Sequence, residues 1–233
     1  MKCLTTEPFF NQQIFNDFIV SSGAVGFFEQ PIKLNSGRMS NWYVNYRKIA
    51  SDVFLTDKLS DFVIEFVKEK EIAVGCFYGV PEGATKLGIL TQFKWAKMQS
   101  DYSAGKYVLP MGRGKPKDHG QPEDKYFVGI PSGKTVLLED VTTTGKAVIE
   151  TIDKLHEANV EIVAAIGMTN RNEKRDDGKT VEQAIAEKGV KYYAMSNALE
   201  LLPLVCQKFK PNAEITAAVE KYFENYGVEK IKL

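Results

Sequence analysis

Side chains that build disulfide frameworks and metal clusters are scarce in this 233-residue sequence. The three cysteines, Cys3, Cys76 and Cys206, lie far apart without a Cys-x-x-Cys pair, and the two histidines, His119 and His156, lie in different segments. This scarcity disfavours a disulfide-stapled fold and a zinc cluster. We therefore expect a cytoplasmic protein whose chemistry depends on other groups, and we expect His156, inside a helical pattern, to lie at the surface.

An excess of charge of one sign is also lacking, because 30 Lys and Arg residues balance 30 Asp and Glu residues. Nucleic-acid binders usually carry a basic excess that neutralises phosphates, so we expect no nucleic-acid partner, whereas a small phosphorylated ligand is compatible with this balance. No apolar run approaches about 18 residues, and residues 1–13 lack the apolar core of a signal peptide, so we expect no membrane segment.

Helical and strand patterns alternate over most of the chain, and the length favours one large domain with a small appendage. Residues 31–50 alternate at period two around Asn35-Ser36-Gly37, which predicts a hairpin. Residues 111–133 are polar and rich in Gly, Pro and Lys, which predicts a functional or mobile loop without an element of its own. The predicted helices lie within 8–22, 52–67, 79–98, 142–160, 181–189 and 211–227, and the predicted strands lie at about 73–80, 106–110, 135–141, 161–171 and 191–197.

This alternation implies right-handed crossovers and an α/β fold with a mostly parallel sheet covered by helices on both faces. We expect an α/β core over 51–233, with a mobile loop at about 111–130, and a small N-terminal unit over 1–50. In such sheets ligands bind at the carboxyl ends of the strands, so the loops that follow the strands are the place to look for chemistry.

The string VLLEDVTTTGKAV, residues 136–148, places Glu139 and Asp140 at the end of an apolar strand and then turns through threonines and Gly145 into a helix. Such a turn offers backbone N–H groups and a helix N-terminus to one phosphate, and the adjacent carboxylates can accept hydrogen bonds from ribose hydroxyls. The combination favours a ribose 5-phosphate site. The alternative is a buried strand that ends in a solvated acid pair, with threonines that only cap the helix.

The string VLLEDVTTTG is similar to the phosphoribosyl pyrophosphate signature of type I phosphoribosyltransferases. The resemblance implies that Glu139 and Asp140 hold the ribose hydroxyls, with Asp140 counted among the catalytic residues. It also implies a type I phosphoribosyltransferase-like fold, in which the N-terminal unit forms a hood over the base site. The residues expected to hold the 5-phosphate are Thr142, Thr143, Thr144 and Gly145, and Thr143 is also expected to contact the substrate.

The segment RGKPKDHG, residues 113–120, resembles the catalytic loop of orotate phosphoribosyltransferases, with Lys117, Asp118, His119 and Gly120 at its end. A basic loop of this kind can stabilise the charge that develops on a departing pyrophosphate, and its closure can exclude water. The resemblance implies that Arg113 and Lys117 contact pyrophosphate, that Lys115 assists, and that His119 is a further donor or a proton-transfer group. The alternative is a solvated basic loop.

Three more segments extend the resemblance. LNSGRMSNWYVN (34–45) is similar to the hairpin that covers the base, where Tyr43 and Asn45 are candidates, and GVPEGATKLG (79–88) occupies the place of a pyrophosphate-binding loop. TNRNEK (169–174) implies that Arg171 pairs with the orotate carboxylate, for which a planar guanidinium is suited. Outside that motif, Arg171 would be taken for a loop arginine in water.

The sequence also departs from the family pattern. Asn35 stands where many members have lysine, Gly114 separates Arg113 from Lys115, Glu82-Gly83 stands where a Tyr-Lys pair is frequent, and Glu139 replaces the more usual Asp. The resemblance implies orotate and phosphoribosyl pyrophosphate as substrates, Mg²⁺ held through ligand oxygens and water without direct protein ligands, and a homodimer that shares the loop. The departures keep two alternatives open, a phosphoribosyltransferase for another base and a non-catalytic regulator that binds phosphoribosyl pyrophosphate.

Overall fold

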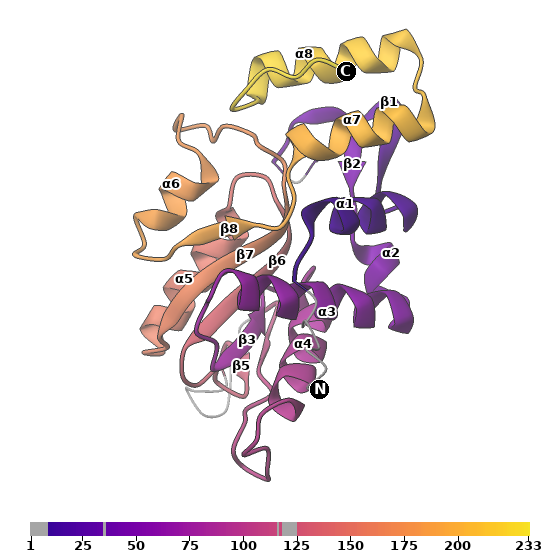
Figure 1. The fold of residues 1–233 in the computed structure, drawn as a ribbon. Helices are drawn as coiled ribbons and strands as arrows, with labels where there is room; N and C mark the ends of the chain where they lie inside the picture. The colour runs from indigo at the N-terminus through magenta and orange to yellow at the C-terminus, as the bar shows by residue number, and fades with distance from the viewer. Residues whose placement is uncertain (1–8, 35, 116, 118–124) are drawn as a thin grey trace, which may run out of the picture.

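The computed structural model describes residues 9–34, 36–115, 117 and 125–233, and Figure 1 shows their arrangement. Within these ranges no helix has the length and apolar character needed to cross a membrane. The helices are α1 (Gln12–Ser21), α2 (Arg47–Ala50), α3 (Val53–Glu69), α4 (Thr85–Lys97), α5 (Lys146–Glu157), α6 (Val181–Ala186), α7 (Ala198–Phe209) and α8 (Ala213–Tyr226). The strands are β1 (Val25–Lys33), β2 (Met39–Val44), β3 (Cys76–Gly79), β4 (Met111–Gly112), β5 (Phe127–Val128), β6 (Thr135–Thr142), β7 (Ile162–Asn170) and β8 (Tyr192–Ala194).

The central sheet is parallel, with the strand order β3-β6-β7-β8. Strands β6 and β7 pair over most of their length, and their last residues, Thr142 and Asn170, are direct partners. The loops that leave these two strands therefore start side by side at one edge of the sheet. The predicted mostly parallel sheet is confirmed.

Helices cover both faces of this sheet, as the sequence predicts. Val136 and Leu138 of β6 belong to one buried cluster with the apolar side of α3, whereas Leu137 belongs to a second cluster with α5 and α6. This division follows from strand geometry, because successive side chains point to opposite faces. Figure 1 shows α5 and α6 on one side of the sheet and α3 and α4 on the other.

The predicted N-terminal hairpin is also confirmed, since β1 and β2 pair antiparallel, although β1 begins at Val25, before the predicted range of 31–50. It is followed by the short helix α2, which the sequence patterns do not predict. Trp42 and Tyr46 are buried in the same cluster as the sheet residues, and the Trp42 ring stacks on Phe223 of α8 with 6.1 Å between ring centroids. The core is therefore continuous from the sheet to the hairpin, and the proposed boundary at residue 50 stays a prediction.

The prediction of a strand at 106–110 is wrong. The side chain of Gln92 on α4 accepts a hydrogen bond from the backbone N–H of Phe77 on β3 and donates one to the carbonyl of Val108, both at 2.9 Å. An amide side chain thus lies where a direct strand ladder would have to form, and Pro110 has no N–H to offer. Two short strands, β4 and β5, pair instead within the segment expected to lack elements.

The structure also contains α7, which the sequence analysis leaves out and which continues through Pro203. Asn197 caps its first turn by accepting hydrogen bonds from the backbone N–H groups of Leu199 and Glu200.

His156 is exposed on α5, as expected.

Candidate active site

The two adjacent acids lie at the carboxyl end of β6, with side chains on opposite faces of the sheet. Glu139 is 7% exposed, and its Oε1 accepts a hydrogen bond from the backbone N–H of Asp140 at 3.2 Å. Burial, followed by the charge of Asp140, raises the pKa of Glu139 well above its usual value. Asp140 is half-buried, and its Oδ1 accepts a hydrogen bond from the N–H of Val141 at 2.9 Å. The pair therefore combines one buried carboxyl with one accessible carboxylate.

The turn that follows leads directly into α5. Gly145 has a φ of 71°, a left-handed conformation that glycine adopts readily, and it brings no capping side chain to the first turn of the helix. The first N–H groups of a helix have no intrahelical acceptor, so this turn can offer them to an anion. Thr143 and Thr144 are half-buried beside it, and Arg175 donates a hydrogen bond to the carbonyl of Thr144.

Thr142 is oriented differently from its two neighbours in the turn. Thr142 is 1% exposed, and its Oγ1 would lie 2.7 Å from a Cβ added to Gly167 on β7. The hydroxyl therefore lies over the neighbouring strand, while the carbonyl of Thr142 accepts a hydrogen bond from the N–H of Arg171 at 2.9 Å.

One loop contacts Asp140, and a second segment contacts that loop. A Cβ added to Gly83 would lie 2.5 Å from each carboxylate oxygen of Asp140, so the loop after β3 contacts Asp140 through a bare backbone. The carboxylate of Glu82 lies against Gly114, where an added Cβ would overlap it. The contact at Gly83 brings segment 79–88 to the end of β6, and the contact at Gly114 brings segment 111–115 to Glu82 within that loop.

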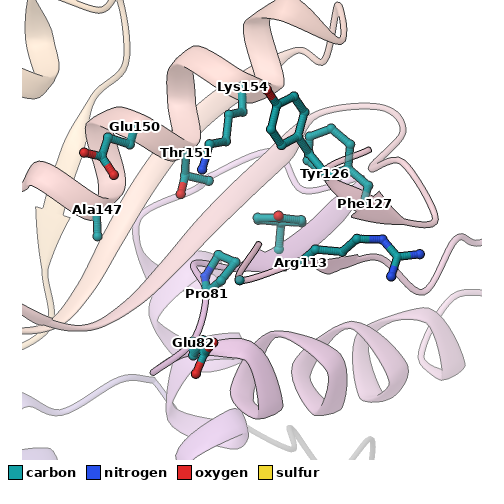
Figure 2. Close-up of a pocket in the computed structure, with 11 residues that line it drawn as sticks. Pro81, Glu82, Arg113, Tyr126, Phe127, Ala147, Glu150, Thr151 and Lys154 are labelled. Atoms are coloured by element: carbon teal, nitrogen blue, oxygen red, sulfur yellow. The ribbon is translucent and has the colours of Figure 1, made fainter. Parts of the chain in front are cut away.

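A small cavity of about 170 Å³ lies between these loops and α5. Figure 2 shows Glu150, Thr151 and Lys154 lining it from α5, with Pro81 and Glu82 on the far side. Its wall also includes Tyr78, Arg113, Gly114, Tyr126, Phe127 and Ala147.

The base of the predicted catalytic loop is held by backbone hydrogen bonds. The N–H of Arg113 donates to the carbonyl of Tyr126 at 2.8 Å, and the N–H of Lys117 donates to the carbonyl of Lys125 at 2.9 Å. Lys115 is exposed. Asp118, His119 and Gly120 lie outside the described residues, as does Asn35.

Arg171, at the end of β7, is not the loop arginine in water that it would be outside its motif. It is 2% exposed, its Nε donates to Glu173 Oε1 at 2.6 Å, and its guanidinium carbon lies 3.7 Å from the centroid of the Trp42 ring. Its Nη2 donates to Ser40 Oγ at 3.2 Å. The guanidinium thus contacts the face of β2 that carries Ser40 and Trp42.

The other two candidates for the base site are placed elsewhere on the hairpin. Tyr43 points to the opposite face of β2, where its ring packs over Gly26 and lies 4.6 Å, centroid to centroid, from Phe28. Asn45 is exposed, and its Oδ1 accepts a hydrogen bond from the N–H of Arg47 at 3.0 Å. The structure therefore does not bring Tyr43 and Arg171 together.

Sequence reasoning missed three residues near this site. Tyr46 is buried and shares a hydrogen bond of 2.9 Å with the hydroxyl of Thr169, which joins the hairpin to the end of β7. Glu173 pairs with Arg171, and Arg38 pairs with Glu173. The last two stand within strings that the sequence analysis singles out, 34–45 and 169–174, so their charged character was a signal that could have been used.

Paired acids, a threonine-glycine turn and a helix N-terminus at the edge of a parallel sheet are the arrangement that the resemblance to type I phosphoribosyltransferases implies. No family model matches the chain. The orotate phosphoribosyltransferase of Bifidobacterium adolescentis is 32% identical over 235 aligned positions, which cover 91% of this chain and 96% of the relative. That of Rhodopseudomonas palustris is 30% identical over 178 positions, which cover 73% of this chain and 87% of the relative.

The crystal structure of orotate phosphoribosyltransferase from Francisella tularensis matches the fold with a TM-score of 0.65 at 19% identity, covering 92% of this chain and 99% of that one. The chain belongs to the orotate phosphoribosyltransferase family.

Proposed function

We propose that this protein transfers the ribose 5-phosphate group of phosphoribosyl pyrophosphate to N1 of orotate, giving orotidine 5'-monophosphate and pyrophosphate. This is a step of pyrimidine biosynthesis. The observation that carries the proposal is the arrangement at the end of β6, where the acid pair is followed by the uncapped turn into α5. The carbonyl of Thr142 in this turn accepts a hydrogen bond from the N–H of Arg171, so Arg171 lies directly beside it. Family membership supports the same reaction.

The donor would bind along the edge of the sheet. The N–H groups at the start of α5, with Thr143, Thr144 and Gly145, are suited to the 5-phosphate, and Asp140 is suited to accept hydrogen bonds from the ribose hydroxyls. Glu139 is buried, so it would contact a ribose hydroxyl only after local movement. Its position next to Asp140 supports that role. Thr142 supports the turn through its backbone.

Pyrophosphate would leave toward the loop that starts at Arg113. In this proposal Arg113, Lys117 and His119 donate to the departing group, Lys115 adds charge, and closure of the loop keeps water from the reactive ribosyl cation. The ribosyl–pyrophosphate bond breaks as the bond from N1 of orotate to the ribose carbon forms, so positioning and electrostatics supply most of the rate.

Mg²⁺ is suited to this site as an ion that the oxygens of phosphoribosyl pyrophosphate and water would chiefly bind. Asp140 at the end of β6 and Glu82 on the loop after β3 carry carboxylates at the place that a pyrophosphate would approach, and oxygen ligands and water suit this ion. When bound to pyrophosphate oxygens and water, the ion would neutralise charge on the leaving group.

The base would be recognised through its carboxylate by Arg171, whose planar guanidinium is suited to a bidentate contact. Because Arg171 is 2% exposed beneath Ser40 and Trp42, contact with a base requires the hairpin β1–β2 to move away from it. Tyr43 and Asn45 would then contact the base only after such a rearrangement.

The reaction is tested by the absorbance of orotate after protein, Mg²⁺ and phosphoribosyl pyrophosphate are mixed. We expect the orotate band to fall at a rate proportional to protein concentration, and we expect no turnover of uracil, adenine or guanine under the same conditions. Turnover of one of those bases instead would favour a different phosphoribosyltransferase. No turnover of any base, with phosphoribosyl pyrophosphate still bound, would favour a regulator.

The role of the loop is tested by Lys117→Ala against Lys125→Ala, which removes a lysine from the opposite stem of the same loop. We expect Lys117→Ala to lower kcat by about 10²-fold or more with donor binding retained, and Lys125→Ala to stay near the wild type. Equal loss in both variants would show that loop charge in general, and not Lys117, matters.

We further propose a cytoplasmic homodimer in which each loop reaches the partner's site. Family resemblance supports the dimer, and the free thiols of Cys76 and Cys206 support a reducing compartment. Light scattering gives the mass in solution. Mixing an inactive Lys117→Ala chain with an inactive Asp140→Asn chain should restore activity if the loop is shared, and should restore none if each subunit uses its own loop.

A further inference from the structure

Two arginines share one buried carboxylate on the base side of the site. Glu173 has a side chain that is 0% exposed, and its Oε1 accepts from Arg171 Nε at 2.6 Å while its Oε2 accepts from Arg38 Nη1 at 2.9 Å. Arg38 comes from the hairpin connection and Arg171 from the end of β7, so Glu173 bridges two parts of the chain. We call these three residues the Arg38–Glu173–Arg171 triad.

The triad carries one positive charge more than its buried anion can balance. Arg171 is 2% exposed, and the side chain of Arg38 is 9% exposed. The second acid that pairs with Arg38 is Asp176, whose side chain is 94% exposed and therefore screened by water. Buried charge without a partner is costly, so this arrangement is suited to receive one more anion.

Aromatic rings lie beside the triad, together with two neutral acceptors, Ser40 Oγ for Arg171 and the Lys174 carbonyl for Arg38. The indole Nε1 of Trp42 and the hydroxyl of Tyr222 are both buried and have no hydrogen-bond partner among the described residues. The Trp42 ring lies 3.7 Å from the Arg171 guanidinium, and the Tyr222 ring lies 6.0 Å from it. An indole N–H can only donate, so one buried donor that lacks an acceptor, Trp42 Nε1, stands next to the excess positive charge, whereas the Tyr222 hydroxyl can donate or accept and interacts with both Glu173 and Arg171.

We propose that Arg38 is a specificity-determining positioning residue, which acts through Glu173 to leave Arg171 with the net positive charge that selects a base carrying a carboxylate. This inference rests on the proposed function and goes further, because it assigns the preference for an acidic base to the triad and not to Arg171 alone. Without Arg38, Glu173 would neutralise Arg171 completely, and an incoming carboxylate would meet no net charge.

Charge restoration separates this role from a structural one. In Arg38→Gln the net charge of the triad falls to zero, and we expect the KM for orotate to rise about tenfold, with kcat and the KM for phosphoribosyl pyrophosphate within about twofold of the wild type. In the double variant Arg38→Gln/Glu173→Gln the net charge returns to one, and we expect the KM for orotate to recover most of the loss. Arg47→Gln removes an exposed arginine of the same hairpin region and serves as the matched control.

If Arg38 had a purely structural role, the double variant would have a higher KM for orotate than Arg38→Gln, because the double variant removes more contacts than the single variant. The proposal is overturned if the double variant has a KM for orotate equal to or above that of Arg38→Gln, or if Arg38→Gln changes kcat and both KM values together. Arg38→Lys keeps the charge but loses the planar fork, and it covers the case in which Arg38→Gln does not fold: its KM for orotate should rise by less than about tenfold, and a rise of about tenfold or more would overturn the proposal.

Direct binding keeps the inference apart from the proposed reaction. If the wild type turns over no base, the proposed function fails, and the quenching of tryptophan fluorescence by orotate and by uracil, measured with Trp95→Phe so that Trp42 is the only source, still measures the preference for a carboxylate. The triad then predicts tighter binding of orotate than of uracil in the wild type and loss of that preference in Arg38→Gln. Equal affinities in the wild type would overturn it.

Discussion

The contact between Gly83 and Asp140 gives a sharp test of the active-site geometry. In Gly83→Ala the new Cβ would lie 2.5 Å from both carboxylate oxygens of Asp140, whereas an ordinary contact is 3.4–4 Å, so one of the two groups must move by about 1 Å. A displacement of about 1 Å of a positioned group can cost about 10²-fold in rate. We therefore expect kcat/KM for phosphoribosyl pyrophosphate to fall by about that factor.

Steady-state kinetics and thermal unfolding should be measured together, with Gly105→Ala as the control. Gly105 has a φ of 76° and no neighbour within 4 Å of an added Cβ, so its substitution strains the backbone far from the acids. We expect Gly105→Ala to lose about 1 kcal/mol of stability with unchanged kinetics, and Gly83→Ala to show the reverse pattern. Activity of Gly83→Ala within twofold of the wild type would refute the assignment of Asp140 to the donor site.

Three further predictions concern stability. Because the pKa of Glu139 is raised in the folded protein, its stabilising contribution is present below pH 4.5, the ordinary pKa, and is lost as the pH rises through the higher folded value. The melting temperature of Glu139→Gln should therefore exceed that of the wild type by a margin that grows with pH across that window. Identical dependence of the two melting temperatures on pH would contradict the burial of Glu139. Leu138→Ala should cost about 2–5 kcal/mol in urea unfolding because Leu138 is fully buried in the central strand, and a loss below 1 kcal/mol would argue against that placement. Thr180→Ala should cost about 1 kcal/mol by breaking the capping box with Gln183 on α6, and a double variant with Gln183→Ala should add little if the two act as one unit.

The fold was largely predictable because its elements have strong local patterns. The apolar run of β6, the Asp52 cap of α3 and the period-two alternation of the hairpin each specify an element without knowledge of its neighbours. The segment 106–110 has an equally strand-like composition, yet it forms no ladder because Gln92 from a distant helix occupies the position between it and β3. The position of Gln92 depends on tertiary contacts, so the local sequence pattern of 106–110 does not predict it.

The candidate site was predictable to the same degree. Strand ends meet at one edge of a parallel sheet, so the string 136–148 and Arg171 could be placed near each other from sequence. The burial of Glu139 and the pairing of Arg171 with Glu173 could not, because each depends on how another layer covers the strand end. Alternation along β2 does separate Tyr43 from the face that meets Arg171, and that signal was present in the sequence.

Backbone pairing joins the loop after β7 to the end of α8, far along the chain. The N–H of Lys174 donates to the carbonyl of Tyr226, and the N–H of Val228 donates to that of Asn172, on either side of Glu173. Arg38 reaches the same place from 135 residues away in sequence. Contacts this distant form late in folding, because the intervening chain must first be ordered. The sheet edge proposed to hold the 5-phosphate therefore does not depend on residues 226–228, whereas the segment around Glu173, which is proposed to select the base, is completed only when those residues are present.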